Sequence, residues 1–209
     1  MSSKDATIAH TSDFHLPPNL TVEQQIVICV GQLVVEWAVC ESILRGVYVA
    51  ITGGTSSTAR DFSEVAWLST SNTNARCDLL TRATFAANIP ETFKKEIKVT
   101  ISHFKGVTRT RNFFCHAAYE VNPDTFELVA VEGHHLTLNE ELVEFDRRTA
   151  DKAMVHSLLT AITNCGRLAR EGMGLVLALQ SHLGAHFPEL PALPDGYPIF
   201  PAFLLRQTE

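Results

Sequence analysis

The sequence predicts an all-α fold: a bundle of four to five helices, with a small β-hairpin insertion and an irregular proline-rich C-terminal tail. The run from Ile26 to Ile51 is apolar on nearly every side of a helix, as expected for a helix buried in a bundle. Apolar residues between 91 and 118 recur every three or four positions. Only the stretch Phe126 to Glu132 has a β-like composition, and it lies between a turn signal and a glycine.

We expect the first helix to run from Val22 to about Ile51. Thr21 is its expected N-cap, and Gln24 stands near the capping-box position, where its side chain can bond back to the cap. Gly53 and Gly54 end the helix, because glycine adopts the left-handed conformation of a helix C-terminus without strain.

This first helix is also long enough to cross a membrane. Glu36, Glu41 and Arg45 lie in its middle, however, and charged side chains there are costly in lipid. We therefore expect a helix buried in the bundle or across a subunit interface, and no membrane association. The polar N-terminus lacks the apolar region of a signal peptide, and the five cysteines form no CxxC pair. Both features favour reduced thiols and a cytoplasmic protein.

Three further helices are expected before the β-like stretch. The first is short, from Asp61 to Leu68, with Trp67 facing inward. A second main helix covers Asn72 to Asn88. The third runs from Glu91 to about Ala118, with Pro90 at or near its first position, where the missing amide hydrogen has no helical partner to lose.

The second half of the chain begins with the hairpin and ends with a long helix. Phe126 to Glu132 is the expected first strand, and His135 to Leu138 its partner. Residues Asn139 to about Leu183 are expected to be helical, with a short segment near Leu142 to Phe145 and then a long fourth helix. Three glycines in this helix predict close helix packing: Gly166, Gly172 and Gly174.

The length of 209 residues fits one domain with extensions. We assign residues 1–20 to an N-terminal arm, 21–184 to the helical domain, and 185–209 to a tail whose proline spacing is typical of polyproline II. The net charge of -6 argues against a broad basic surface that grips a nucleic-acid backbone. A small, locally positive pocket is compatible with it.

The stretch from Arg111 to His116 contains the candidate site. Asn112 and His116 are i,i+4 neighbours on one helix face, and the long side chain of Arg111 can reach across to them. The three side chains can converge on one phosphate, which Arg would hold while His moves the proton. In the simpler alternative, Arg111 caps a helix C-terminus and His116 is an ordinary core or surface histidine.

The pattern R-N-x-x-x-H, here Arg111, Asn112 and His116, resembles the signature of the HEPN superfamily. Many of those helical proteins also carry a Gly, a Trp and a Glu along the first helix, as Gly31, Trp37 and Glu41 do here. The resemblance extends over roughly residues 22–183 and does not include the tail.

The resemblance implies an HEPN-like bundle that forms a homodimer, with two motifs facing each other across a cleft. It also implies metal-independent RNA cleavage that needs no cofactor. His116 would serve as acid and base, Arg111 would stabilise the phosphate, and Asn112 would orient the phosphate or the imidazole. The products would carry a 2′,3′-cyclic phosphate, and DNA would resist because it lacks the 2′-OH.

Two further groups of side chains could carry chemistry. Glu41 could orient Arg111 as a buried carboxylate, or could simply pair with Arg45 at i,i+4. His134 and His135 beside Glu132 could suggest a metal, but no HExxH and no Cys partner stands at ligand spacing. We therefore expect no metal ion.

Our leading interpretation is a HEPN-type ribonuclease that acts on RNA as a homodimer, as a toxin or a stress or defence effector. The alternative is a non-catalytic helical interaction module that retains the motif. The negative charge and the apolar first helix and tail favour this alternative. The RNA sequence that would be cut, and the existence of a neutralising protein partner, stay open.

Overall fold

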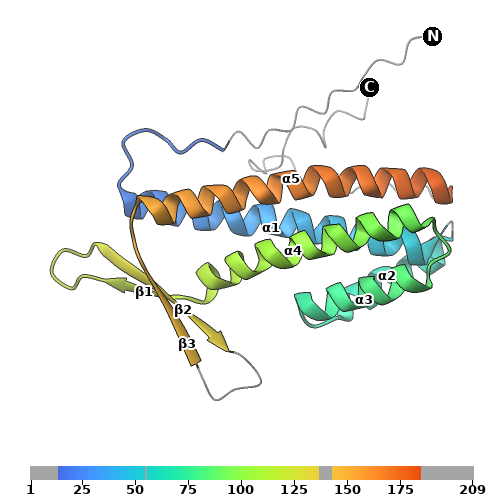
Figure 1. Ribbon diagram of the computed structural model, residues 1–209, viewed down its shortest axis with the longest axis horizontal. Coiled ribbons are helices and arrows are strands. Elements are labelled where there is room, and N and C mark those ends of the chain that lie inside the picture. Colours follow the sequence, from blue (N-terminus) through green and yellow to red (C-terminus); the bar gives the residue numbers. More distant parts are fainter. Residues whose placement is uncertain (1–13, 55, 137–142, 185–209) are drawn as a thin grey trace, which may run out of the picture.

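The structure is a computed structural model that describes residues 14–54, 56–136 and 143–184. Within these ranges the chain forms five helices and one three-stranded antiparallel sheet (Figure 1). The predicted mostly helical fold is therefore confirmed. Most of the expected N-terminal arm and the whole proline-spaced tail, 185–209, lie outside the described residues.

Helix α1, Val22–Gly53, is the central element of the bundle and contacts all four other helices. Thr21 accepts a hydrogen bond from the Gln24 amide, and the Gln24 side chain accepts one from the Thr21 amide, so the predicted capping box is present. The helix ends at Gly53 and Gly54 as predicted, with Gly54 at φ +51°. By length and composition α1 would also suffice to span a membrane, although helices that are buried in soluble proteins pass the same test.

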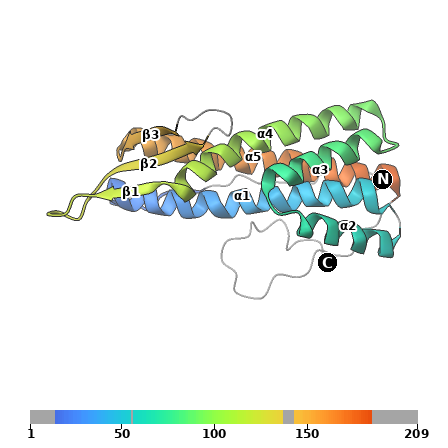
Figure 2. The ribbon, with the colours of Figure 1, turned by 90° about the horizontal axis from the view of Figure 1, so that it is seen from below.

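Helix α5, Lys152–Leu183, lies along α1 over most of its length (Figures 1 and 2). The two helices run parallel, because contacts advance together from Cys40 with Cys165 to Gly46 with Val176. The two helices approach closely at Gly172, where a Cβ atom would lie 2.7 Å from Cγ2 of Ile43. The prediction of close packing at the α5 glycines is therefore confirmed at Gly172. It is wrong at Gly174, which is exposed and where a Cβ atom would meet nothing within 4 Å.

Two shorter helices pack beside α1. Helix α2, Ser57–Ser69, begins four residues earlier than expected because Ser56 caps it, accepting a hydrogen bond from the Ala59 amide. Trp67 faces inward as predicted, buried against Tyr48 with ring centroids 5.5 Å apart. Helix α3, Thr73–Ala86, has Asn72 as its N-cap rather than as its first residue.

Helix α4, Glu91–His116, runs back along the bundle in the opposite direction to α1 and α5 (Figure 1). Pro90 is its N-cap, directly before the first helical residue, which agrees with the prediction that Pro90 lies at or near that position. Its buried face is mainly apolar and repeats every three or four residues, which is the pattern that predicted the helix. The buried residues are Ile97, Thr100, Ile101, Phe104, Val107, Thr108, Phe113 and Phe114.

The sheet is larger than the predicted hairpin. Strand β1, Ala118–Val121, pairs with β2, Leu128–Leu136, and β2 pairs with β3, Val143–Thr149, in the order β1-β2-β3. The expected partner strand near His135 is wrong, because His134 and His135 continue β2 and pair with β3.

The expected helix over Leu142 to Phe145 is also wrong for the residues that the structure describes. Val143 and Phe145 alternate with Glu144 and Asp146, which is the two-residue period of a strand rather than the period of a helix. The long helix starts at Lys152, where the Asp151 carboxylate accepts a hydrogen bond from the Met154 amide.

Candidate functional site

The three motif residues lie in the last two turns of α4, which lead directly into the sheet. Arg111 is half-buried, whereas Asn112 and His116 are exposed, and His116 is the last residue of the helix. Nη1 of Arg111 donates a hydrogen bond to Oδ1 of Asn112 at 3.0 Å. The structure thus brings Arg111 and Asn112 together, with the imidazole of His116 on the same helix end, open to solvent.

The guanidinium of Arg111 lies against the indole of Trp37 on α1. Its Cζ atom is 4.6 Å from the ring centroid, which is a cation–π contact. The other contacts of Trp37 fix its ring: Nε1 donates to Oγ1 of Thr108 at 2.9 Å, and the Phe104 ring stacks on it at 5.7 Å. Trp37 is 9% exposed, so the platform under Arg111 is part of the core.

Arg111 is therefore a cation held at the edge of the core. Its Nε atom is buried and has no hydrogen-bond partner among the described residues. Burial of a charged donor without a partner is costly. The indole face and the Asn112 amide are the two groups that offset this cost, so the position of the guanidinium depends on both.

The two phenylalanines inside the motif anchor the end of α4. Phe113 and Phe114 are both buried and meet edge to face, with ring centroids 5.0 Å apart. Phe113 packs directly on the backbone of β2 at Gly133, where an added Cβ would come 2.3 Å from the ring. Arg148 of β3 covers the same ring at 4.1 Å. The sheet therefore holds this helix end in place.

Tyr119 of β1 closes the helix end. Its hydroxyl donates a 2.6 Å hydrogen bond to the carbonyl of Phe114, one of the carbonyls that the helix leaves unpaired. Although the residue as a whole is 40% exposed, partial burial of its hydroxyl, with a smaller contribution from the nearby Cys115 thiol, raises the pKa of Tyr119, so the phenol stays a hydrogen-bond donor well above neutral pH.

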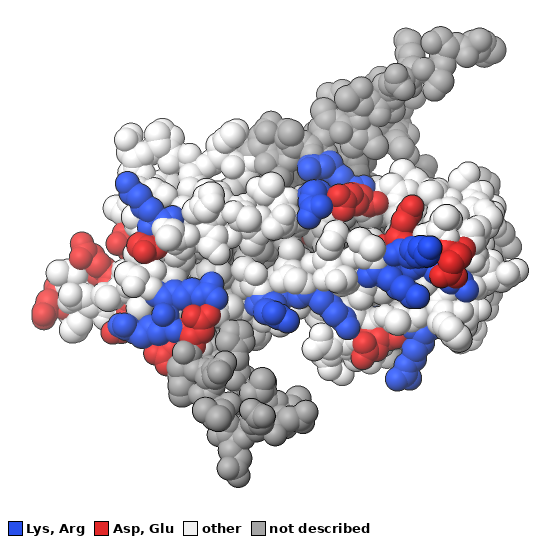
Figure 3. Space-filling model, viewed as in Figure 1, with Lys and Arg blue, Asp and Glu red and all other residues white. Residues whose placement is uncertain are grey.

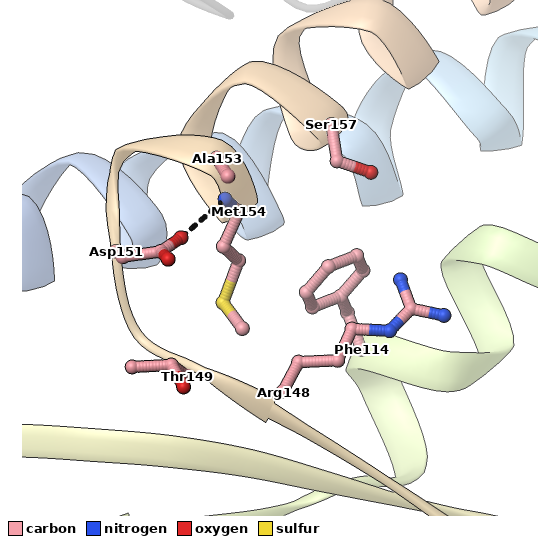
Figure 4. Close-up of a pocket in the computed structure, with 7 residues that line it drawn as sticks. All are labelled: Phe114, Arg148, Thr149, Asp151, Ala153, Met154 and Ser157. Atoms are coloured by element: carbon pink, nitrogen blue, oxygen red, sulfur yellow. Dashed lines mark hydrogen bonds between the residues drawn. The ribbon is translucent and has the colours of Figure 1, made fainter.

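A shallow pocket of about 260 Å³ lies beside the motif, between the end of α4, strand β3 and the first turns of α5. Figure 4 shows Phe114 and Met154 facing each other across it, with Arg148 at its rim. None of the three motif residues lines this pocket. Asn112 and His116 instead face solvent.

The charges near the motif are mixed. Arg148 pairs with Asp146, and Arg147 pairs with Glu120 on β1, each with a nitrogen–oxygen distance of 2.6 Å. Figure 3 shows Lys and Arg side chains interspersed with Asp and Glu over this face, without a continuous basic surface. This agrees with the net charge of -6, and it favours a local contact with an anion over a long backbone track.

Glu41 has a different partner from either that the sequence suggested. Its Oε1 atom accepts a hydrogen bond from Nη1 of Arg76 on α3 at 2.8 Å, in a half-buried ion pair. Arg45 instead lies 3.6 Å from Glu64 on α2. Both expectations for Glu41 are therefore replaced by an interhelical pair, because α2 and α3 each bring an opposite charge to α1.

No group of three His, Cys, Asp or Glu side chains in the described ranges is arranged to hold a metal ion. The side chains of His134 and His135 lie outside what the structure describes. All five cysteines are free, and the sulfur of Cys40 donates to the carbonyl of Cys165 at 3.3 Å. The predicted free thiols are confirmed.

Sequence reasoning missed the support that α1 gives the motif. The sequence indicates Trp37 only as part of a pattern along the first helix, and it does not indicate a role for Thr108. A signal was present, since Phe104, Thr108 and Arg111 are spaced i, i+4 and i+7 and so form one stripe on α4. The sequence does not show which side chain of another helix packs against this stripe.

No protein-family model, no curated protein and no solved structure matches this chain. What the fold and site define is a helical bundle with an arginine, an asparagine and a histidine at one exposed helix end.

Proposed function

We propose that the protein is a metal-independent endoribonuclease of the HEPN type. The observation that carries this proposal is the end of α4, where a half-buried Arg111 is tied to Asn112 and the exposed His116 stands on the same helix end. Cleavage of a phosphodiester through a ribose 2′-OH can use a guanidinium to stabilise charge on the phosphate and an accessible imidazole to move the proton, and this helix end carries both groups.

In the proposed reaction the imidazole of His116 takes the proton of the 2′-OH. The 2′-oxygen forms a bond to phosphorus, and the bond from phosphorus to the 5′-oxygen breaks. The leaving oxygen takes a proton from water or from His116 of a second copy in a homodimer. Arg111 stabilises the charge that develops on the non-bridging oxygens. The products are a 2′,3′-cyclic phosphate and a free 5′-hydroxyl.

One observation favours a second candidate, a non-catalytic interaction module. Helix α2 carries an apolar face on the side opposite its buried Trp67: Phe62, Val65 and Leu68 are 72%, 60% and 60% exposed. Contiguous exposed apolar patches mark interaction surfaces. In such a module the cation–π contact of Arg111 with Trp37 would serve only to join α4 to α1.

The deciding experiment is cleavage of mixed single-stranded RNA in EDTA. Wild type is compared with His116→Ala and Arg111→Ala, and with two controls that remove exposed residues of the same types on the same helix, His103→Ala and Arg109→Ala. The proposal expects cleavage by wild type and both controls, and loss of about 100-fold or more in each motif variant. Uncut DNA and 2′-O-methyl RNA of the same sequence would support attack by the 2′-OH. Wild type that cuts no RNA would favour the module.

A further inference from the structure

Trp37 of α1 contacts three successive turns of α4. Phe104, Thr108 and Arg111 all meet it, by ring stacking, hydrogen bonding and cation–π contact respectively. Seven residues of helix rise by about 10.5 Å, which leaves room for one ring between Phe104 and Arg111. The indole therefore fills the space under the guanidinium instead of touching it only at an edge.

Each contact of the indole removes one kind of motion. The stacked Phe104 ring and the core around it hold the plane of Trp37, and the 2.9 Å hydrogen bond to Thr108 fixes its rotation within that plane. Arg111 is in turn confined from two sides, by the ring at 4.6 Å and by the Asn112 oxygen at 3.0 Å. Its Nε is buried, so an anion from solvent can meet only the Nη groups.

We propose that Trp37 is the positioning residue of the site. It holds the Arg111 guanidinium so that the Nη groups face a phosphate at the His116 end of α4, and Thr108 sets the orientation of its ring. This inference rests on the proposed ribonuclease activity and adds to it a residue that touches neither substrate nor the reacting atoms. A guanidinium that is not held in position stabilises the transition state less, because misplacement by about 1 Å can lower the rate on the order of 100-fold.

The test compares substitutions at Trp37 with a matched loss elsewhere. Trp37→Phe keeps an aromatic face, and Trp37→Leu removes it. Trp67→Leu is the control, since Trp67 is the other buried tryptophan and packs on α1 without contacting the motif. Thr108→Val removes the hydrogen bond at nearly constant volume, and Thr108→Ser restores it, so the inference does not depend on Trp37→Leu being folded.

We expect Trp37→Leu to lower kcat about 10-fold or more with KM nearly unchanged, because the lost interaction acts mainly in the transition state. Thr108→Ser keeps the hydrogen bond and should stay within about threefold of wild type. Trp37→Phe and Thr108→Val both lose that bond but keep an aromatic face under Arg111, so both should fall between wild type and Trp37→Leu. Trp67→Leu should lower the melting temperature and leave kcat unchanged.

A spectroscopic readout separates position from stability. The Nε–Hε resonance of Arg111, assigned by its loss in Arg111→Lys, should carry a ring-current shift from the indole. That shift should disappear in Trp37→Leu and persist in Trp67→Leu. Wild type that cuts RNA, beside folded Trp37→Leu and Thr108→Val that cut equally fast, would overturn this inference alone. Wild type that cuts no RNA would overturn it together with the proposed function.

Discussion

The close contact between α1 and α5 at Gly172 provides a test of the helix packing. Gly172 is buried against α1, and a Cβ atom there would lie 2.7 Å from Cγ2 of Ile43, closer than two carbon atoms can approach. Gly174 is exposed two residues further along the same helix and would place its Cβ in open space. The change Gly→Ala is thus chemically identical at two neighbouring positions with opposite surroundings.

The expected energies follow from two terms. Alanine is better than glycine in a helix by about 1 kcal/mol, and this gain applies at both positions. At Gly172 the overlap must be relieved by moving a β-branched side chain or by separating two helix backbones, which costs about 1–3 kcal/mol. Gly174→Ala should therefore stabilise by about 1 kcal/mol, and Gly172→Ala should be less stable than it by about 1–3 kcal/mol.

Thermal and urea unfolding followed by circular dichroism would measure both variants. For a chain of this size the difference corresponds to roughly 2–12 °C in melting temperature. Ile43→Ala provides the second leg of a double-mutant cycle: in that background Gly172→Ala should become stabilising, because the Cγ2 atom is gone. Equal stabilisation by Gly172→Ala and Gly174→Ala in the wild-type background would refute the close approach of α1 and α5.

Three further outcomes are expected. Glu41→Gln should lower the free energy of unfolding by about 1 kcal/mol, and this loss should be mostly absent in an Arg76→Gln background. The same change should leave RNA cleavage unchanged. A loss of cleavage like that of Arg111→Ala would show instead that Glu41 belongs to the functional site. Cys115 should react first with a thiol reagent in the native protein, since the other four cysteines are buried. Equal reaction rates for all five cysteines would contradict the burial of the other four. Burial raises the pKa of Cys29 from 9.0 to about 11. Between these two pH values the thiol is protonated in the folded state and ionised in the unfolded chain. The resulting stability is complete below pH 9 and declines as pH rises through about 11, and urea titrations of Cys29→Ala should show a smaller decline.

The helical part of the fold could be predicted because its signals are local. The Thr21 cap, the glycines at the end of α1 and the apolar spacing of α4 are each contained in a few neighbouring residues. Errors at helix starts came from single caps: Ser56 extended α2 by one turn, and Asn72 lies just outside α3. The composition of the motif also indicated the end of α4, where Arg111 to His116 lie.

The sheet and the platform of the site depend on contacts between distant residues. Strand β1 is four exposed residues that carry almost no pattern of their own, and it forms by pairing with β2. The partner of Glu41 was missed because Arg76 is 35 positions away, whereas Arg45 was the neighbour visible along the chain. In the same way, Trp37 reaches Thr108 across 71 positions.

The parallel arrangement of α1 and α5 has a consequence for synthesis of the protein. The hydrogen bond from Cys40 to Cys165 joins residues 125 positions apart, within the most extensive helix contact of the bundle. At about 5–20 residues per second, α1 leaves the ribosome roughly 6–25 s before the matching part of α5 exists. During that time α1, which is apolar enough to span a membrane by composition, can pack against α2, α3 and α4 but not against α5. The nascent chain should therefore depend on chaperones until its last helix is made.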